Sequence, residues 1–142
     1  MTEFLIGMGS NIEPKQHLKS AATALSAAFS EAEFSGVYRS AAIGMQDAAD
    51  FLNACCLLQS DMQQDVLAGW LKQLEDAHGR DRSEGSWKPR TLDLDVLMAG
   101  GEVVDDELFR YAHAYVPARE LVDLPHVDVD MSGLEQVDLR LA

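Results

Sequence analysis

Short apolar runs along the chain are separated by longer stretches with helical spacing. Residues 3–9 form a nearly continuous apolar run that ends in a glycine turn, which predicts a short buried strand. Residues 34–40 predict a second strand, and residues 51–59 predict a third that is apolar enough to lie centrally in a sheet. Residues 41–50 have little periodicity, and we expect them to form a loop.

Two stretches repeat their apolar positions every three to four residues, as amphipathic helices do. The first follows Ser10 and Asn11, which are favourable N-cap residues, and has Pro14 near its first position. The second begins at Asp61 and ends around Gly79, which suits a C-cap. The positions expected to face the core are Leu18, Ala22, Leu25 and Phe29 in the first helix and Val66, Leu67, Trp70, Leu71 and Leu74 in the second.

Residues 91–99 alternate cleanly, which predicts a strand with two different faces. One face carries Leu92, Leu94, Val96 and Met98, and the other carries Asp93, Asp95 and Leu97. The glycine pair at 100–101 then turns the chain into a short strand. Beyond it we expect a helical turn near residues 105–114, a short helical piece near 117–122 and a polar tail with weak signals.

The resulting order, β-α-β-β-α-β, predicts an α+β protein with a ferredoxin-like core. In that arrangement both helices pack on one face of an antiparallel sheet, which leaves the other face for a site. The length of 142 residues fits a single domain over residues 1–142.

The charge balance narrows the range of partners. Eleven Lys and Arg residues against 24 Asp and Glu residues give a net charge of −13, which argues against binding to nucleic acid or to anionic membranes. We expect no signal peptide, because the acidic start lacks a positive region, and no membrane span. The adjacent Cys55 and Cys56 are expected to be buried reduced thiols of a cytoplasmic protein. We also expect the protein to be soluble and a monomer.

Asp93 and Asp95 are the strongest chemical signal in the sequence. Alternation places both carboxylates on one strand face, with their Cα atoms roughly 6.5–7 Å apart. Two like charges so close raise each other's pKa unless a cation neutralises them. Mg²⁺ favours hard oxygen ligands, usually one or two carboxylates together with substrate phosphates. If only these two residues are considered, the alternative to a metal site is a solvent-exposed sheet face that carries two ordinary acids.

The loop before these aspartates concentrates positive charge. Arg80, Arg82, Lys88 and Arg90 are four of the 11 basic residues in an otherwise acidic chain. Arginine forks bind phosphate oxygens bidentately, and such a loop is able to close over a nucleotide. Trp87 in the same loop is suited to stacking on a flat ring. The alternative is that these arginines only pair with neighbouring acids.

Several motifs occur together in a fixed order: GMGSN at the start, VYRSAAIG, DFLNACCLL, and GRDR followed by WKPRTLDLDVLMAG. Over about residues 3–125 this pattern resembles the 6-hydroxymethyl-7,8-dihydropterin pyrophosphokinase family of folate biosynthesis. The resemblance implies that the pterin hydroxymethyl oxygen attacks the β-phosphorus of ATP, so that pyrophosphate is transferred and AMP is released. It also implies ATP as co-substrate and two Mg²⁺ ions bound by Asp93 and Asp95.

The resemblance also implies roles for individual positions. The catalytic group comprises Arg80, Arg82, Arg90, Asp93 and Asp95. The pterin site comprises Ser40, Ala42, Ile43, Phe51, Asn53 and Trp87. The nucleotide site comprises Glu75, Arg90, His113 and Arg119, of which the last two keep the family's H-x₅-R spacing.

The residues alone leave alternatives open. Phe51 on an apolar strand is more often a core residue, Glu75 fits a helix-surface acid, and His113 alone is an ordinary surface histidine. The chain departs from the family pattern at Ala112 and Leu121, where proline and an aromatic residue are usual, and its carboxy-terminal region is shorter. A divergent paralogue that binds pterin or nucleotide without efficient transfer is therefore the alternative function, and an acidic interaction module is a third.

Overall fold

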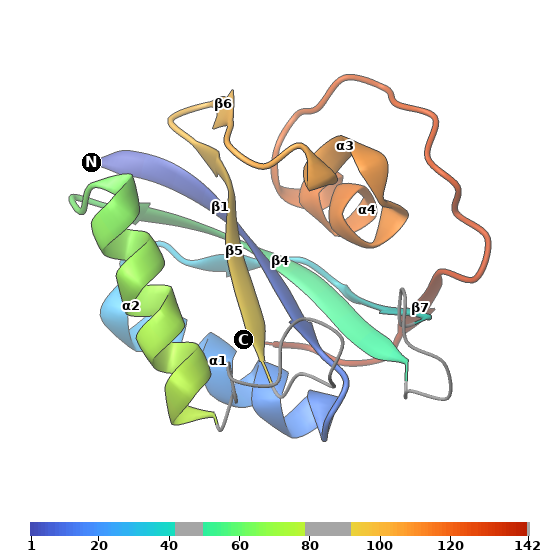
Figure 1. The fold of residues 1–142 in the computed structure, drawn as a ribbon, viewed down its shortest axis with the longest axis horizontal. Coiled ribbons are helices and arrows are strands. Elements are labelled where there is room, and N and C mark those ends of the chain that lie inside the picture. Colours follow the sequence, from blue (N-terminus) through green and yellow to red (C-terminus); the bar gives the residue numbers. More distant parts are fainter. Residues whose placement is uncertain (42–49, 79–91, 142) are drawn as a thin grey trace.

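A single antiparallel sheet organises the molecule (Figure 1). The computed structural model describes residues 1–41, 50–78 and 92–141. Its strands are β1 (Thr2–Ser10), β2 (Glu33–Phe34), β3 (Val37–Ser40), β4 (Phe51–Ser60), β5 (Asp93–Ala99), β6 (Glu102–Val103) and β7 (Glu135–Val137). Its helices are α1 (Pro14–Ala28), α2 (Gln64–Ala77), α3 (Glu107–Arg110) and α4 (Ala112–Leu121). The strand order is β6-β5-β1-β4-β3-β7, with β2 also paired to β4.

The predicted β-α-β-β-α-β core is confirmed as β1-α1-β3-β4-α2-β5, and β4 is central as expected. The predicted strand over residues 34–40 is divided into β2 and β3. Between them, the Ser35 amide donates to the Cys55 carbonyl at 3.0 Å, and the Cys55 amide donates to the Ser35 hydroxyl at 2.8 Å. A side-chain oxygen thus replaces a backbone acceptor of the ladder at this break.

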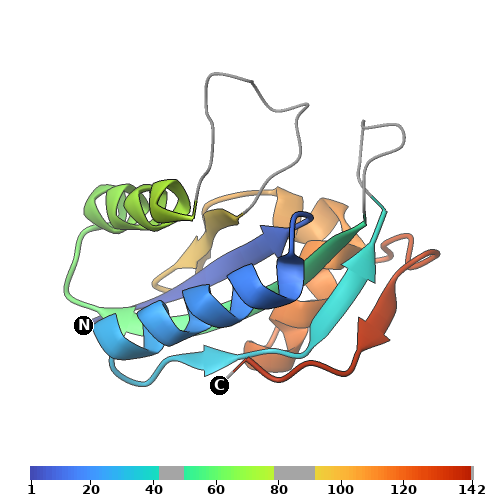
Figure 2. The ribbon, with the colours of Figure 1, turned by 90° about the horizontal axis from the view of Figure 1, so that it is seen from below.

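Helices cover both faces of the sheet (Figure 2). Helices α1 and α2 share one core with the strands, as predicted, and its fully buried members include Phe4, Ile6, Leu18, Leu25, Leu58, Leu67 and Leu92. Helices α3 and α4 pack on the opposite face, against Leu5, Cys55 and Leu97. The sequence predicted helical segments near these positions but did not place them on the sheet, so the three layers are a finding of the structure.

Both cysteines are buried and unbridged, as expected. Burial raises the pKa of Cys56 to about 12 and raises that of Cys55 as well, so both thiols stay protonated at neutral pH.

The ends of the two long helices differ from the predictions. Helix α1 has Pro14 at its start, but its N-cap position is Glu13, in the left-handed region at φ 42°, rather than Ser10 or Asn11. The Ser10 hydroxyl instead donates to the Ile12 carbonyl at 3.1 Å, within the turn after β1. The side chain of Ser10 is therefore used in the turn and does not cap the helix.

Helix α2 begins at Gln64, three residues later than predicted. Its buried positions are Leu67, Leu71 and Glu75, which recur every fourth residue. Val66 was expected in the core but is 54% exposed, because it lies about 100° around the helix from Leu67.

A β-bulge corrects one predicted face of β5. The pairing with β1 shifts between Leu5 and Ile6, so that Leu5 lies opposite Met98 while Ile6 lies opposite Val96. The extra residue of the bulge reverses the facing of the residues that follow it. Met98, predicted to share the face of Val96, therefore packs with Leu97 against α3 and α4. The predicted turn is confirmed, since Gly100 and Gly101 have positive φ values of 59° and 83°.

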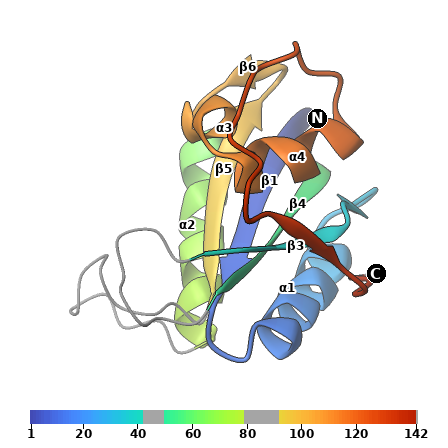
Figure 3. The ribbon, with the colours of Figure 1, turned by 90° about the vertical axis from the view of Figure 1, so that its right-hand side faces the viewer.

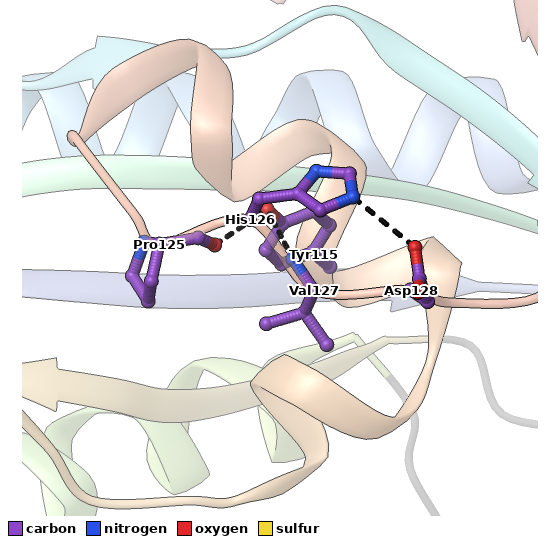
Figure 4. Close-up of polar contacts among 5 residues, drawn as sticks. All are labelled: Tyr115, Pro125, His126, Val127 and Asp128. Atoms are coloured by element: carbon purple, nitrogen blue, oxygen red, sulfur yellow. Dashed lines mark hydrogen bonds and ion pairs between the residues drawn. The ribbon is translucent and has the colours of Figure 1, made fainter.

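The carboxy-terminal segment contributes more structure than its sequence suggested. Strand β7 pairs with β3 and extends the sheet at that edge (Figure 3). The segment after α4 is held by Tyr115, whose hydroxyl donates to the Pro125 carbonyl at 2.7 Å and accepts from the Val127 amide at 3.3 Å (Figure 4). None of the helices in the described ranges is long and apolar enough to cross a membrane.

Candidate active site

Asp93 and Asp95 lie on the face of β5 opposite to the buried Leu92 and Leu94, as predicted. The pKa of Asp95 is raised to about 7. The largest cause of the raised pKa is the partial loss of water around the Asp95 carboxyl group, although the residue stays accessible from the open side of the site. The negative charges of Asp93, Glu75 and Glu107 raise the pKa further. Without a cation, the Asp95 carboxyl group is therefore partly protonated at neutral pH.

Two glycines of β1 form a bare floor beside these acids. Gly9 lies opposite Asn53 of β4 on one side and Asp93 of β5 on the other. A Cβ atom at Gly9 would lie 3.6 Å from the Asn53 Oδ1 atom and 3.8 Å from the Phe51 ring. Gly7 has the equivalent place beside Asp95, although the Leu97 side chain would lie 3.1 Å from a Cβ atom there. Glycine in a strand interior often marks the close approach of a ligand, and here it keeps the space between strands β4 and β5 open.

The acids, the glycine floor and α4 enclose a cavity of about 220 Å³, here named the first cavity. The described residues that line it include the predicted site residues Ser40, Phe51, Asn53, Asp93, Asp95 and His113. They also include Gly7, Gly9, Glu107 and Tyr111, which were not predicted. Gly7 and Gly9 alternate along β1 just as Asp95 and Asp93 alternate along β5, and they pair with them. This alternation in the GMG motif was the sequence signal for the glycine floor. Glu107 and Tyr111 carried no comparable signal, because the packing of α3 was not predictable.

Asn53 is a buried polar residue in the wall of the first cavity, with 6% of its surface exposed. Its amide nitrogen donates to the Tyr38 carbonyl at 3.1 Å and to the Ser40 hydroxyl oxygen at 2.8 Å. Phe51, two residues earlier, is half-buried at the same wall and so is not a filled core position. An apolar ring beside a fixed amide is the combination that binds a flat, polar-edged heterocycle.

His113, at the second position of α4, lines the first cavity near Asp93. Its ring stacks on Tyr111 with the centroids 5.2 Å apart and the planes 14° apart. Burial lowers the pKa of His113, and the charge of Asp93 only partly opposes this effect. The imidazole is therefore neutral at neutral pH.

A second cavity of about 270 Å³ follows α2 along the outer side of β5. Its described lining comprises Gln64, Ala68, Leu71, Lys72, Glu75, Asp93, Leu94, Asp95, Val96 and Val104. Among the residues that the structure describes, the two cavities share only Asp93 and Asp95. The acid pair thus stands at the junction of two spaces, one lined by aromatic and polar side chains and the other by aliphatic and charged side chains.

Glu75 lines the second cavity from the inside of α2. It is 3% exposed, and its carboxylate accepts a hydrogen bond from the Leu94 amide at 2.6 Å. The alternative of a helix-surface acid is therefore wrong. Leu94 separates the two aspartates, so Glu75 holds the backbone between them.

Arg119 lies outside both cavities. It is exposed on α4, with its guanidinium 5.5 Å from the centroid of the Tyr115 ring. Arg119 follows His113 by six residues, so the two side chains point about 120° apart around the helix axis. The structure therefore does not bring these two predicted phosphate-binding residues to the same cavity. The other predicted residues lie outside the described ranges: Ala42, Ile43, Arg80, Arg82, Trp87 and Arg90.

The donor set at the junction fits Mg²⁺ bound together with a phosphate ligand. Asp93 and Asp95 supply two hard oxygen donors whose mutual repulsion a cation would relieve. No group of three or more potential metal-ligating side chains occurs in the described part of the chain. Mg²⁺ commonly takes only one or two carboxylates from a protein and completes its shell with water and phosphate.

Comparisons with known proteins agree with this geometry. A family model described as 7,8-dihydro-6-hydroxymethylpterin-pyrophosphokinase matches residues 5–132. Proteins named 2-amino-4-hydroxy-6-hydroxymethyldihydropteridine pyrophosphokinase are similar to the chain. The one from Haemophilus influenzae is 32% identical over 87% of this chain and 79% of its own length. Those from Methylorubrum extorquens and Bacillus subtilis are 32% and 31% identical over 91% and 87% of this chain, and 83% and 75% of their own lengths. The resemblance seen in the motifs is confirmed: the chain belongs to the 7,8-dihydro-6-hydroxymethylpterin-pyrophosphokinase family.

Proposed function

We propose that the first cavity binds the pterin and the second binds the nucleotide, with Asp93 and Asp95 between them. The chain transfers pyrophosphate from ATP to 6-hydroxymethyl-7,8-dihydropterin and releases AMP, the reaction of its family in folate biosynthesis. The observation that carries the arrangement is that two chemically different cavities meet at one carboxylate pair. A transfer between two bound substrates needs such a junction, because most of its catalysis is alignment and charge neutralisation.

Asp93 and Asp95 would hold two Mg²⁺ ions, which when bound neutralise phosphate charge and orient the attacking hydroxyl. The chain's own contribution is to keep the two carboxylates on one strand face at a fixed spacing. Leu92 and Leu94 anchor the strand on the core side, and Glu75 holds the Leu94 amide. In this proposal the neutral His113 donates one N–H to a phosphate oxygen, with Asp93 near its ring.

The pterin ring would lie over the glycine floor. In this position Phe51 offers an aromatic surface and Asn53 a buried amide, while Ser40 contributes from the end of β3. Ala42, Ile43 and Trp87 complete the pterin site in the proposal.

The nucleotide would take the second cavity, with its phosphates directed toward the aspartates. Leu71 and Val96 give aliphatic walls for the base. Arg80, Arg82 and Arg90 are proposed to bind the phosphates and to stabilise charge during transfer, as arginines do in related chemistry. Arg119 would reach the phosphates only from outside the two cavities.

We further propose a cytoplasmic monomer that binds neither nucleic acid nor membranes, which the net charge of −13 supports. The comparisons do not favour the alternative of a paralogue that binds without transfer.

A direct assay tests the function. The protein is incubated with ATP, Mg²⁺ and the pterin, and the nucleotide products are separated. AMP with a diphosphorylated pterin is expected. ADP would indicate an ordinary kinase, and the absence of any product would indicate a protein that only binds its ligands.

A further inference from the structure

The side-chain amide of Asn53 has only one orientation that fits its neighbours. The backbone carbonyl of Tyr38 lies 3.1 Å from one end of the amide, and a carbonyl oxygen only accepts hydrogen bonds. The Oδ1 and Nδ2 ends of an asparagine amide have nearly the same shape, but only Nδ2 is a donor. The end that faces the Tyr38 carbonyl must therefore be Nδ2. The second Nδ2 hydrogen is donated to the Ser40 hydroxyl oxygen at 2.8 Å.

This orientation turns the Asn53 oxygen away from β3 and toward β1. A Cβ atom built on Gly9 would have the Oδ1 atom as its nearest neighbour, at 3.6 Å. Since Gly9 and Asn53 both line the first cavity, the amide oxygen faces the cavity floor. Both amide hydrogens are used on β3, so the wall at this point presents an acceptor and no donor from Asn53.

We propose that Ser40 is a positioning residue that holds Asn53 so that its oxygen selects a hydrogen-bond donor on the ligand. The inference rests on the proposed placement of the pterin in the first cavity, since that ring carries N–H donors on its edge. Ser40 acts through Asn53: without its oxygen, one buried Nδ2 hydrogen loses its acceptor, and only the Tyr38 carbonyl still holds the amide in this orientation. The amide oxygen is then held less firmly, and the preference for a ligand with a donor at this edge should weaken.

Steady-state kinetics of three proteins test the consequence for binding: the wild type, Ser40→Ala and Ser40→Thr. Loss of one hydrogen bond that orients the amide should raise the KM for the pterin about 3- to 10-fold in Ser40→Ala, with a smaller effect on kcat. Ser40→Thr keeps the hydroxyl and should restore the wild-type KM. The discrimination against a pterin methylated at its lactam nitrogen, which lacks that donor, should fall in Ser40→Ala alone. An unchanged KM and discrimination in Ser40→Ala would overturn the inference.

Nuclear magnetic resonance of the ligand-free proteins gives a readout that does not depend on activity. The two side-chain amide protons of Asn53 should exchange slowly with solvent in the wild type and in Ser40→Thr, and faster in Ser40→Ala. Equal protection in Ser40→Ala would sink the positioning role even if the KM changed. A wild type that makes no AMP with the pterin would instead contradict the proposed function, while the exchange measurement would still decide the orientation of the amide.

Discussion

The two faces of the sheet are built from the same strands and have opposite characters. On the face of α1 and α2, alternate residues of β1, β4 and β5 are large, apolar and fully buried. On the other face, the intervening residues near one end of these strands are Gly7, Gly9, Asn53, Asp93 and Asp95. The first face stabilises the fold, whereas the second leaves open space between small and polar residues. The difference shows that one face supplies the stability that the other does not.

The largest expected effect is on catalysis, from Asp95→Asn. The change keeps the shape of the side chain but removes half of the carboxylate pair, so AMP formation should fall by about 10³-fold or more. Asp128→Asn, at an exposed site far along the chain, is the matched control and should keep wild-type activity. Near-normal turnover in Asp95→Asn would contradict the proposed metal site.

Two substitutions in β1, one on each face of the sheet, should distinguish the stabilising face from the ligand-binding face. Ile6→Ala, on the core face, should lower the free energy of unfolding by about 2–5 kcal/mol, and the KM values of the folded fraction should be unchanged. Gly9→Ala meets only ordinary contacts, so stability should be kept, while a methyl group on the floor should raise the KM for the pterin about 10-fold. Chemical denaturation and steady-state kinetics measure both effects. A Gly9→Ala protein that loses stability but keeps a normal KM for the pterin would contradict the division of roles between the two faces.

The raised pKa of Asp95, about 7, should make the polar face sensitive to pH in the absence of metal. The folded protein holds this proton more tightly than the unfolded chain, whose carboxyl titrates near pH ~3.9. The contribution to stability is therefore present below about pH 4 and is lost as the pH rises through about 7. Asp95→Asn does not ionise, so its Tm in EDTA should rise relative to the wild type between pH 4 and pH 8. A constant difference in Tm over that range would argue against the shift.

The smallest expected effect concerns the contact between β3 and α4. The Tyr38 hydroxyl donates to the Glu120 carboxylate, which also accepts from the Gly36 amide at 3.0 Å. Tyr38→Phe should cost about 0.5–1.5 kcal/mol of unfolding free energy, the usual worth of one such bond. The effect should be constant up to pH 9, because burial and Glu120 raise the pKa of Tyr38 to about 12. Denaturant titrations at pH 6 and pH 9 would reveal any difference.

The core of the fold was predictable because its signals are local. The apolar runs of β1 and β4 and the alternation of β5 are visible in the sequence, and so are the carboxylates that the alternation places on one face. The bulge in β5 was not predictable, because it depends on the pairing with β1. The placement of α3 and α4 on the second face, and with it Glu107 and Tyr111 in the site, depends on tertiary packing for the same reason.

The site was predictable where the residue types are rare in strands, as with Asn53 and the aspartates. It was not predictable where a residue is ordinary and only its neighbours give it a role. Taken alone, Glu75 fits a surface acid of an amphipathic helix; only the family resemblance assigned it to the nucleotide site, and the Leu94 amide beside its carboxylate explains its burial. The predicted phosphate contacts of His113 and Arg119 followed the family's H-x₅-R spacing; in the structure, His113 lines the first cavity and Arg119 lies outside both cavities.

The contact between Glu75 and Leu94 also affects the tendency of the protein to aggregate. Strand β6 covers β5 only at Met98 and Ala99, so the remaining outer edge of β5 has no partner strand in the described part of the protein. An unpaired edge is a template for aggregation. By occupying an outward amide with a negative charge, α2 makes this edge unsuited to the addition of a foreign strand, and we expect solubility to suffer first when that helix is loosened.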